Sequence, residues 1–532
     1  MAWRAGLRYR PDMPAIVIIG AGFGGIGMAI ALKKAGFHDF VVLEKSEDLG
    51  GTWHHNQYPG CACDVPSPLY SYSFELNPSW SRMFAPQQEI WEYLRMCARK
   101  YGVDEHIRYG RAVEHLDWDD GARRWNIATS RGAGEGRDAG EGRDGADARG
   151  DGDGVGRAED YRARAEDYRA RAEDYRARAV VAGAGALHLP SVPDIPGAER
   201  FGGPAFHSAQ WDRSLDLGGK RVAVIGTGAS AIQFIPEIAK RAGHLDVFQR
   251  TPPWIHPRPD APLPARVREV LAASPLAARV VRDALYWLLE ARGLGFAVNP
   301  KLMAPQEQLA RRLIANQISD PELRAAVTPD YTIGCKRILL SSDYYPALQR
   351  PNVDLITDDV TGITETAVIT ADGTAHETDV IIYATGFRVV ESVTGLNVAG
   401  RDGRKLTPDT LEAYHGITLA GFPNFFMLLG PNTGLGHTSV VFMIESQIQH
   451  IMSCLRRLAR DQAGTIEVRE PVVRRYNREL QQRLRRAVWS EGGCRSWYLD
   501  ADGVNRALWP GFTFEYWART RRARRSAYTV AP

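Results

Sequence analysis

Residues 221–231 read RVAVIGTGASA, and this stretch decides the fold class. An apolar strand runs directly into the glycine turn of Gly226 and Gly228, and a helix begins near Ala231. This order lets a pyrophosphate approach backbone N–H groups at a helix N-terminus. A near copy, IVIIGAGFGG, occupies residues 16–25. The two copies predict an α/β chain with two Rossmann-like dinucleotide-binding domains.

The residue after the second strand of each copy indicates which nucleotide binds there. Glu44 stands 24 positions after Gly20, and its carboxylate suits a ribose diol while repelling a 2′-phosphate. Arg250 stands 24 positions after Gly226, and its guanidinium suits bidentate contact with a phosphate. We therefore predict an unphosphorylated ribose, as in FAD, at the first site and NADP at the second. The alternative for Arg250 is a surface side chain at the end of a strand.

Composition excludes several classes of protein. A net charge of +3, despite 66 basic residues, predicts no general nucleic-acid partner. The basic run at 519–525 is interpreted as a solvated tail. Six cysteines do not make a disulfide scaffold, so a reducing cytoplasm is expected. Cys61 and Cys63 fit neither a redox pair nor a zinc site, and they are interpreted as packing residues.

Membrane-spanning and secreted proteins are not indicated either. No signal peptide is visible, because the first apolar run leads into a glycine turn. The most apolar helical stretch, residues 270–298, is broken by charged residues and cannot span a bilayer. An amphipathic contact with a surface remains open for that stretch.

Changes in the sequence pattern along the chain indicate the domain limits. Residues 1–205 are expected to form the first part of the FAD-binding domain, residues 206–344 the NADP-binding domain, and residues 345–532 the second part of the FAD-binding domain with a C-terminal tail. A helical insertion is expected at about 260–330. Residues 131–178 contain the repeated heptad RAEDYRA, whose Ala and Tyr would bury too little surface to order it. That segment is interpreted as an insertion on a surface hairpin without a catalytic role.

Three other stretches are expected beside the cofactors. Residues 50–74 are rich in Gly, Pro and aromatic side chains and predict a long ordered loop. An apolar strand ends in Ala-Thr-Gly at 384–386, where small residues permit close approach to a ligand. Residues 428–439 read LLGPNTGLGHTS and form a glycine turn that opens a helix.

A family resemblance is carried by residues 201–212, FGGPAFHSAQWD. They fill the pattern F-x-G-x-x-x-H-x-x-x-W-[PD] completely, at Phe201, Gly203, His207, Trp211 and Asp212. With the two dinucleotide motifs and Ala-Thr-Gly before Phe387, the chain resembles the Baeyer–Villiger monooxygenases of the class B flavin-containing monooxygenase family. The heteroatom-oxidising sister group normally ends this pattern with Tyr and a basic residue. His207 and Trp211 are expected to be structural or conformational residues of the link between domains.

The resemblance implies roles for single residues. Arg337 matches a catalytic arginine and Asp64 an active-site aspartate that orients it; Lys336 matches a contact to NADP. Arg250 and Thr251 match a clamp for the 2′-phosphate, and no metal ligand is expected. The full set expected to bind the cofactors is Gly20, Gly22, Gly25, Glu44, Thr52, Trp53, Asp64, Thr385, Gly386, Asn432, Gly226, Gly228, Ala231, Arg250, Thr251, Lys336 and Trp497.

The resemblance also implies a reaction. NADPH reduces FAD, O2 adds to give a C4a-peroxyflavin, and one oxygen atom is inserted next to the carbonyl of a small lipophilic ketone, giving an ester or lactone. The alternatives are oxidation of sulfur or nitrogen, an uncoupled NADPH oxidase, and a nucleotide-binding sensor. A disulfide reductase is disfavoured because it needs a C-x-x-C pair or similar near the flavin. The chain departs from the family at Trp53-His54-His55-Asn56-Gln57, where many relatives carry aromatics and Arg, and at Gly183-Ala184-Gly185, where relatives often have Ala-Thr-Gly.

Overall fold

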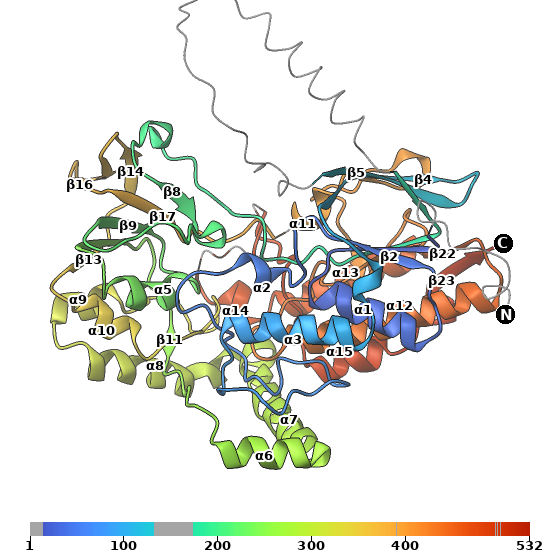
Figure 1. The fold of residues 1–532 in the computed structure, drawn as a ribbon, viewed down its shortest axis with the longest axis horizontal. Helices are drawn as coiled ribbons and strands as arrows, with labels where there is room; N and C mark the ends of the chain where they lie inside the picture. Colours follow the sequence, from blue (N-terminus) through green and yellow to red (C-terminus); the bar gives the residue numbers. More distant parts are fainter. Residues whose placement is uncertain (1–13, 132–173, 390, 495, 497, 501) are drawn as a thin grey trace, which may run out of the picture.

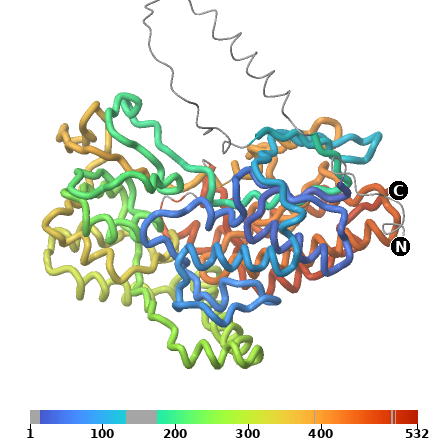
Figure 2. The backbone as a smooth tube through the Cα atoms, in the orientation of Figure 1, coloured from blue at the N-terminus to red at the C-terminus, as the bar shows by residue number. Residues whose placement is uncertain are grey.

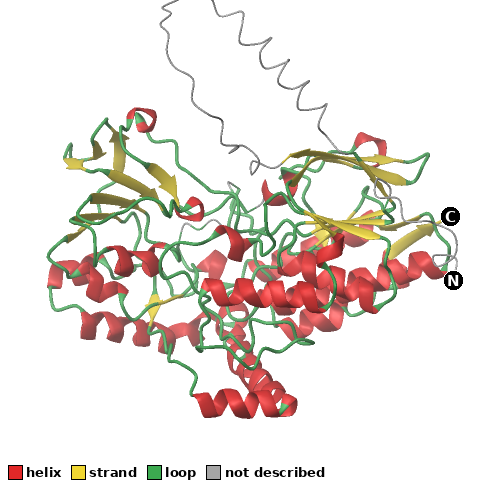
Figure 3. Cartoon of the chain, in the orientation of Figure 1, coloured by secondary structure: helices red, strands yellow, loops and turns green. Residues whose placement is uncertain are grey.

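A computed structural model describes residues 14–131, 174–389, 391–494, 496, 498–500 and 502–532. Most of the repeat insertion and Trp497 therefore lie outside the described residues. Two parallel sheets lie on opposite sides of the molecule, with helices between and below them (Figures 1 and 3). The two dinucleotide-binding folds predicted from the glycine motifs are thus confirmed.

The first sheet is built around the N-terminal glycine motif. All its neighbouring strands are parallel, and β1 pairs with β2 from Ile16 opposite Phe40 and with β7 from Ile16 opposite Ala179. Helices or loops cover both faces, which is why its strands read as unbroken apolar runs. The strand order is β21 (Phe425–Met427), β7 (Ala179–Ala182), β1 (Ile16–Ile19), β2 (Phe40–Leu43) and β3 (Ile107–Arg108).

The second sheet is also parallel throughout and contains the motif at 221–231. Its strand order is β13 (Val353–Ile356), β10 (His244–Phe248), β9 (Arg221–Ile225), β17 (Val380–Tyr383) and β8 (Ala205–His207). Strands β13 and β17 follow the domain limit expected at residue 344, so that limit needs correction: the second sheet continues to Tyr383. Two similar parallel sheets offer similar apolar edges, and a strand pattern alone does not say which edge a later strand joins.

The remaining strands form smaller sheets. A four-stranded sheet covers the first domain, and its β5–β6 hairpin flanks the repeat insertion, while a three-stranded sheet lies beside the second domain. Their members are β18 (Val398–Ala399), β4 (Arg111–Asp119), β5 (Arg124–Arg131) and β6 (Tyr175–Ala177), then β14 (Val360–Ile363), β15 (Ala367–Thr370) and β16 (Ala375–Glu377). Two-stranded sheets join β11 (Ile255–His256) to β12 (Leu339–Leu340), β19 (Ala413–Tyr414) to β20 (Thr418–Leu419), and β22 (Thr465–Val468) to β23 (Tyr528–Ala531).

Helices cover the sheets and supply the expected insertion, which Figure 2 shows in yellow-green. Those of the nucleotide-binding folds and the C-terminal part are α1 (Phe23–Lys34), α2 (Thr52–His55), α3 (Gln87–Lys100), α5 (Ala231–Ile238), α10 (Tyr344–Leu348), α11 (Glu391–Thr394), α12 (Val440–Arg460), α13 (Glu470–Leu484), α14 (Val488–Glu491) and α15 (Thr513–Thr520). The insertion holds α6 (Ala265–Ala273), α7 (Pro275–Glu290), the π-helix η4 (Leu294–Val298), η5 (Pro300–Met303), α8 (Ala304–Gln317) and α9 (Pro321–Ala326).

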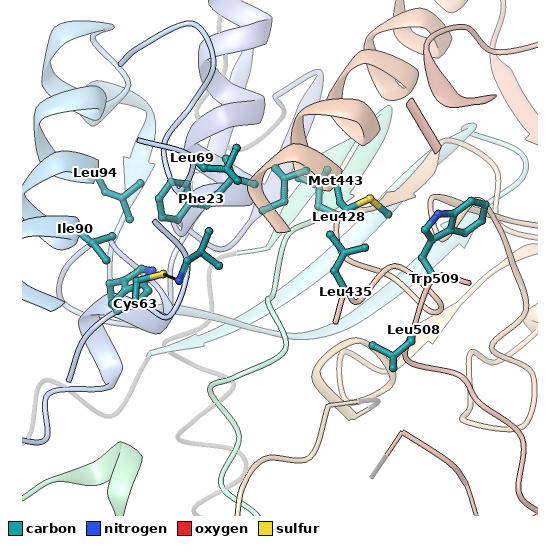
Figure 4. Packing of buried hydrophobic residues seen from close by; sticks show 14 of the residues in the cluster. Phe23, Cys63, Leu69, Ile90, Leu94, Leu428, Leu435, Met443, Leu508 and Trp509 are labelled. Carbon is teal, nitrogen blue, oxygen red and sulfur yellow. Dashed lines mark hydrogen bonds between the residues drawn. The ribbon is translucent and has the colours of Figure 1, made fainter. Parts of the chain in front are cut away.

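One apolar core runs from the first domain into the C-terminal part of the chain. Phe23 and Leu94 pack on one side of it, and Met443 and Trp509 on the other (Figure 4). Cys61 and Cys63 are buried free thiols, with Cys63 inside this cluster, which confirms that they are packing residues. Among the described residues, no helix is long and apolar enough to cross a membrane.

Candidate active site

At the glycine turn of each sheet, the backbone lies in close contact with the backbone of a later segment. Gly20 has φ +91°, and a Cβ placed on it would lie 2.7 Å from the Gly183 carbonyl oxygen. Gly226 has φ +104°, and its Cβ would lie 2.7 Å from the Ala384 carbonyl oxygen. Residues 183–185 and 384–386 are therefore counterparts, each at the end of a strand beside a glycine turn. The Ala-Thr-Gly stretch accordingly lies at the second nucleotide fold.

Both turns open a helix whose first N–H groups are available to a ligand. No side chain caps α1 or α5, and neither helix has an acidic residue in its first turn. A Cβ on Gly22 would meet only backbone atoms of residues 50–51, at 3.6 Å or more, whereas one on Gly25 would lie 1.8 Å from the Gly20 oxygen. The helix N-terminus and its positive end of the dipole are thus exposed to a pyrophosphate, as FAD and NADP require.

Glu44 lies at the end of β2 and is buried. Its Oε2 accepts a hydrogen bond from the Ala21 N–H at 2.7 Å, and its Oε1 accepts one from the Ser46 N–H at 2.9 Å. The carboxylate thereby fixes the glycine turn. Because each oxygen has a second lone pair, both can still accept a ribose hydroxyl.

Two cations meet at the end of the second sheet. Arg250 follows β10 and is exposed, next to Thr251. Burial lowers the pKa of Lys336, and the neighbouring charge of Arg250 lowers it further. Lys336 Nζ also lies 5.1 Å from the centre of the Tyr331 ring. Two like charges that act on each other favour an anion nearby, which fits the predicted phosphate clamp.

Asp64 and Arg337 form a two-point ion pair between the long loop after β2 and the loop before β12. Arg337 Nε donates to Asp64 Oδ2 at 2.6 Å, Nη2 donates to Oδ1 at 2.7 Å, and Nη1 donates to the Leu435 oxygen at 3.4 Å. Burial alone would raise the pKa of Asp64, but the charge and hydrogen bonds of Arg337 hold it below its ordinary value. The Asp64 carboxylate in turn raises the pKa of Arg337. Both groups are ionised at neutral pH.

A disulfide adjoins this pair. Cys335, two residues before Arg337, is bonded to Cys494 with a Cα–Cα distance of 6.1 Å. The bond ties the loop of Arg337 to the C-terminal segment that contains Tyr498, a buried residue next to the ion pair. A reducing compartment is expected from the six cysteines, and this bond is a disulfide that the sequence does not predict, while four other cysteines are free. No local sequence signal announces a pairing across 159 positions.

The other residues expected at the cofactors have defined places. Thr52 begins α2, directly after Gly50 and Gly51 with their positive φ, and Trp53 is buried with its Nε1 donating to the Tyr70 hydroxyl at 3.2 Å. Asn432 is buried in the turn before α12.

The Asn432 side chain donates to the oxygens of Asn505 at 2.7 Å and Leu508 at 3.2 Å. Its amide group therefore holds the C-terminal segment against the turn.

The residues of the 201–212 motif lie at the edge of the second sheet. A Cβ on Gly203 would lie 2.3 Å from the Asp379 oxygen, so only glycine fits there. His207 is the last residue of β8 and lies opposite Tyr383; its ring packs edge-on against Phe387 at 5.4 Å. Burial lowers the pKa of His207.

The end of the motif packs on the second fold and on itself. Trp211 lies 5.2 Å from Phe234 of α5, and Asp212 accepts hydrogen bonds from the N–H and the hydroxyl of Ser214 at 2.8 and 2.6 Å. Thr385 Oγ1 donates to the Ser191 oxygen at 2.5 Å, where two segments of the chain link the sheets. The motif thus braces the link rather than the ion pair.

Arg258 is a neighbour that sequence reasoning missed. Its charge helps to lower the pKa of Asp64, and its Nη2 lies 3.4 Å from Asp260 Oδ2. The Arg-Pro-Asp sequence around it carries no motif of its own. Only the fold brings it near the site.

Comparison with known proteins agrees with this geometry. A family model of NAD(P)-binding Rossmann-like domains matches residues 18–95, and one of flavin-binding monooxygenase-like proteins matches residues 166–267. The chain is 46% identical to a Baeyer–Villiger monooxygenase of Pseudomonas aeruginosa over 96% of this chain and 90% of that one. It is 42% identical to a Baeyer–Villiger monooxygenase of Streptomyces coelicolor over 97% and 92% of the two chains.

Solved structures give the same result. The cyclohexanone monooxygenase from Rhodococcus sp. Phi1 bound to NADP⁺ superposes with a TM-score of 0.80 at 25% identity, over 98% of this chain and 100% of that one. Two nucleotide folds facing one ion pair define an NADPH-dependent flavin monooxygenase with FAD and NADP(H) as cofactors. This chain belongs to the Baeyer–Villiger monooxygenases of that class.

Proposed function

We propose that this chain inserts one oxygen atom of O2 next to the carbonyl of a small lipophilic ketone, forming an ester or lactone and consuming NADPH. The observation that supports it most is the Asp64–Arg337 pair between the two nucleotide folds. Bound FAD, once reduced by NADPH, supplies the activation of O2.

The first sheet is the site proposed for FAD and the second for NADP(H). Gly20, Gly22 and Gly25 let the pyrophosphate of FAD reach the N-terminus of α1, and Glu44 accepts the ribose hydroxyls. Gly226 and Gly228 do the same at α5, while Arg250, Thr251 and Lys336 hold the 2′-phosphate. These assignments rest on the uncapped helices and on the paired cations described above.

Arg337 is the residue proposed to stabilise the negative charge that develops on oxygen as the carbonyl is attacked. Its guanidinium has five N–H donors; two bind Asp64 and one reaches Leu435, which leaves two for the reacting oxygen atoms. Asp64 fixes the plane of the guanidinium, so little reorganisation is needed as the charge develops. Asp64 acts here as a positioning residue.

A substrate panel tests the proposed reaction. The flavin is first reduced by NADPH without oxygen, then O2 is added with a ketone or with a sulfide, and the products are identified by mass spectrometry. We expect esters or lactones from at least one class of ketone. Sulfoxides alone, or hydrogen peroxide alone, would contradict the proposal and favour the heteroatom oxygenase or the uncoupled oxidase.

We place the reaction in the cytoplasm, where NADPH is supplied. Four buried free thiols agree with a reducing compartment.

A further inference from the structure

Exposed apolar side chains are concentrated in one part of the chain. Eighteen large apolar residues are exposed among the described residues, and eleven of them lie between residues 265 and 309. That segment contains α6 and α7, which project from the body away from both sheets (Figure 1). Single exposed apolar residues are ordinary, but a contiguous set marks an interaction surface.

Helix α7 exposes large apolar side chains although it also buries apolar ones, and the charged Arg279 and Asp283 are exposed beside them. The largest exposed apolar side chains are those of Leu276, Val280, Trp287 and Leu288, exposed at 72%, 58%, 59% and 63%. The inward side of α7 carries the buried Arg282, which donates to the Pro68 and Leu69 oxygens at 3.1 and 2.9 Å and lies 3.7 Å from Glu445. These inward polar contacts fix which face of α7 points outward.

Helix α15 continues this exposed apolar surface. The ring of Trp287 lies 6.0 Å from that of Phe514. Phe514, Trp517 and Arg521 are spaced i, i+3 and i+7, so they share one face of the helix and its C-terminal end. The Arg521 guanidinium lies 5.7 Å from the centre of the Trp517 ring. The apolar surface therefore ends at a row of basic side chains.

Those basic side chains line a groove of about 880 Å³ between α1, α12 and the segment after α15. Asp461 neutralises only part of it, through Arg457 and Arg460. Nη1 of Arg457 is buried without a hydrogen-bond partner, and no hydrogen bond or ion pair is described for the side chains of Arg456 and Arg522. The cations that line the groove are Lys34, Arg456, Arg457, Arg460, Arg521, Arg522 and Arg525.

We propose that α6, α7, α15 and this basic groove form one surface that docks on an anionic phospholipid bilayer. The exposed apolar side chains lie among the acyl chains and the groove takes phosphate headgroups, the two signals that a peripheral protein needs for stable attachment. A second copy of the chain fits less well, because a two-fold contact would bring the same basic grooves toward each other. This inference does not rest on the proposed ketone chemistry.

The inner side of the same segment reaches the candidate active site. Phe296 of η4 is buried, and its ring lies 3.1 Å from the position of a Cβ on Gly334 and 3.0 Å from that of a Cβ on Gly436. Gly334 precedes the disulfide and Arg337, and Gly436 follows Leu435. Docking would thus place the lipid surface beside the segment that packs on the loops of the ion pair.

Vesicle sedimentation with the flavin-loaded protein tests the docking. Vesicles of phosphatidylcholine with phosphatidylglycerol in equal parts are compared with vesicles of phosphatidylcholine alone. We expect binding to the mixed vesicles that weakens with salt. The double variants Trp287→Ser/Leu288→Ser and Arg456→Gln/Arg522→Gln should each lower the partition coefficient roughly tenfold or more.

Matched variants outside the surface are Val192→Ser, which removes another exposed apolar side chain, and Arg350→Gln, which removes another exposed arginine. These should bind as the wild type does. All variants should retain flavin content and NADPH-driven flavin reduction, which separates loss of docking from loss of the fold.

Four outcomes would overturn the proposal. The first is no binding to anionic vesicles, and the second is an equal loss of binding in the matched variants. Another is a dimer that Trp287→Ser/Leu288→Ser converts to a monomer, with no vesicle binding, which would assign the surface to a second copy. The last is pyrophosphate binding that depends on Arg456 and Arg522 while vesicles fail to bind, which would make the groove a site for free anions.

Discussion

The carboxylate of Asp64 and the guanidinium of Arg337 are joined at two points, although 273 positions separate them in the chain. Neither residue lies on a helix or strand: Asp64 lies in the loop after α2, and Arg337 lies in the loop between α9 and β12. The pair therefore forms only when the two folds and the loop at 428–439 are assembled. The distances between the Asp64 and Arg337 side chains therefore depend on how the two folds and this loop are placed.

Replacing Asp64 by Asn should separate positioning from charge. The amide side chain of Asp64→Asn would keep one acceptor for Arg337 but lose the second hydrogen bond and the negative charge. Because hydrogen bonds to charged groups contribute about 1.5–3 kcal/mol, ester formation should fall by roughly tenfold to a hundredfold. Flavin reduction by NADPH should be unchanged in stopped-flow absorbance. Equal losses in both steps would show that Asp64 supports the fold rather than the reaction.

The same pair predicts a pH dependence of stability. The folded pKa of Asp64 lies below its ordinary value, so the contribution of the ion pair is fully present above about pH 4 and is lost as pH falls through the folded pKa. The free energy of unfolding of Asp64→Asn should accordingly approach that of the wild type only in acid. A difference that grows toward acid pH would be incompatible with an ionised Asp64. Denaturant unfolding at a series of pH values makes the comparison.

Coenzyme choice should follow Arg250 and Lys336. Arg250→Gln should weaken the binding of NADPH by about 1.5–3 kcal/mol, since it removes a charge-assisted hydrogen bond to the 2′-phosphate. NADH lacks that phosphate and serves as the internal control, because its KM should barely change. Lys336→Gln should act in the same direction. Equal losses for the two coenzymes would argue against a phosphate clamp at this end of the sheet.

The Cys335–Cys494 bond should stabilise the C-terminal segment. Opening it releases a closed loop of 159 positions, and loss of a native disulfide commonly costs about 2–5 kcal/mol. A reductant should lower the Tm of the wild type and leave the Tm of Cys494→Ser unchanged. Cys454→Ser, which replaces a buried thiol outside the bond, is the control that should still respond to the reductant. Identical responses of wild type and Cys494→Ser would show that the bond does not form.

Much of the nucleotide-binding architecture can be predicted from local sequence. The apolar runs that precede the two glycine turns predict strands, and β1 and β9 lie where these runs place them. Glu44 is recognised for the same reason, since its distance from Gly20 is set by one strand–helix–strand unit. These features depend on neighbours along the chain.

Features that depend on distant neighbours are missed or misassigned from sequence. Strands β13 and β17 join the second sheet, because pairing partners are chosen by the assembled edge and not by the strand itself. The basic run at 519–525 is interpreted from sequence as a solvated tail, but three of its arginines line the groove on α12. The following strand β23 pairs with β22, which anchors the chain end.

Arg337 is proposed to support oxygen transfer and not flavin reduction, and the variant Arg337→Ala separates these two roles. The two half-reactions are measured on one preparation: anaerobic reduction of the flavin by NADPH, then ester formation after addition of O2 and a ketone that the wild type converts. We expect a reduction rate close to that of the wild type and loss of the ester, with hydrogen peroxide released in its place. Ester formation at the wild-type rate would contradict this role of Arg337.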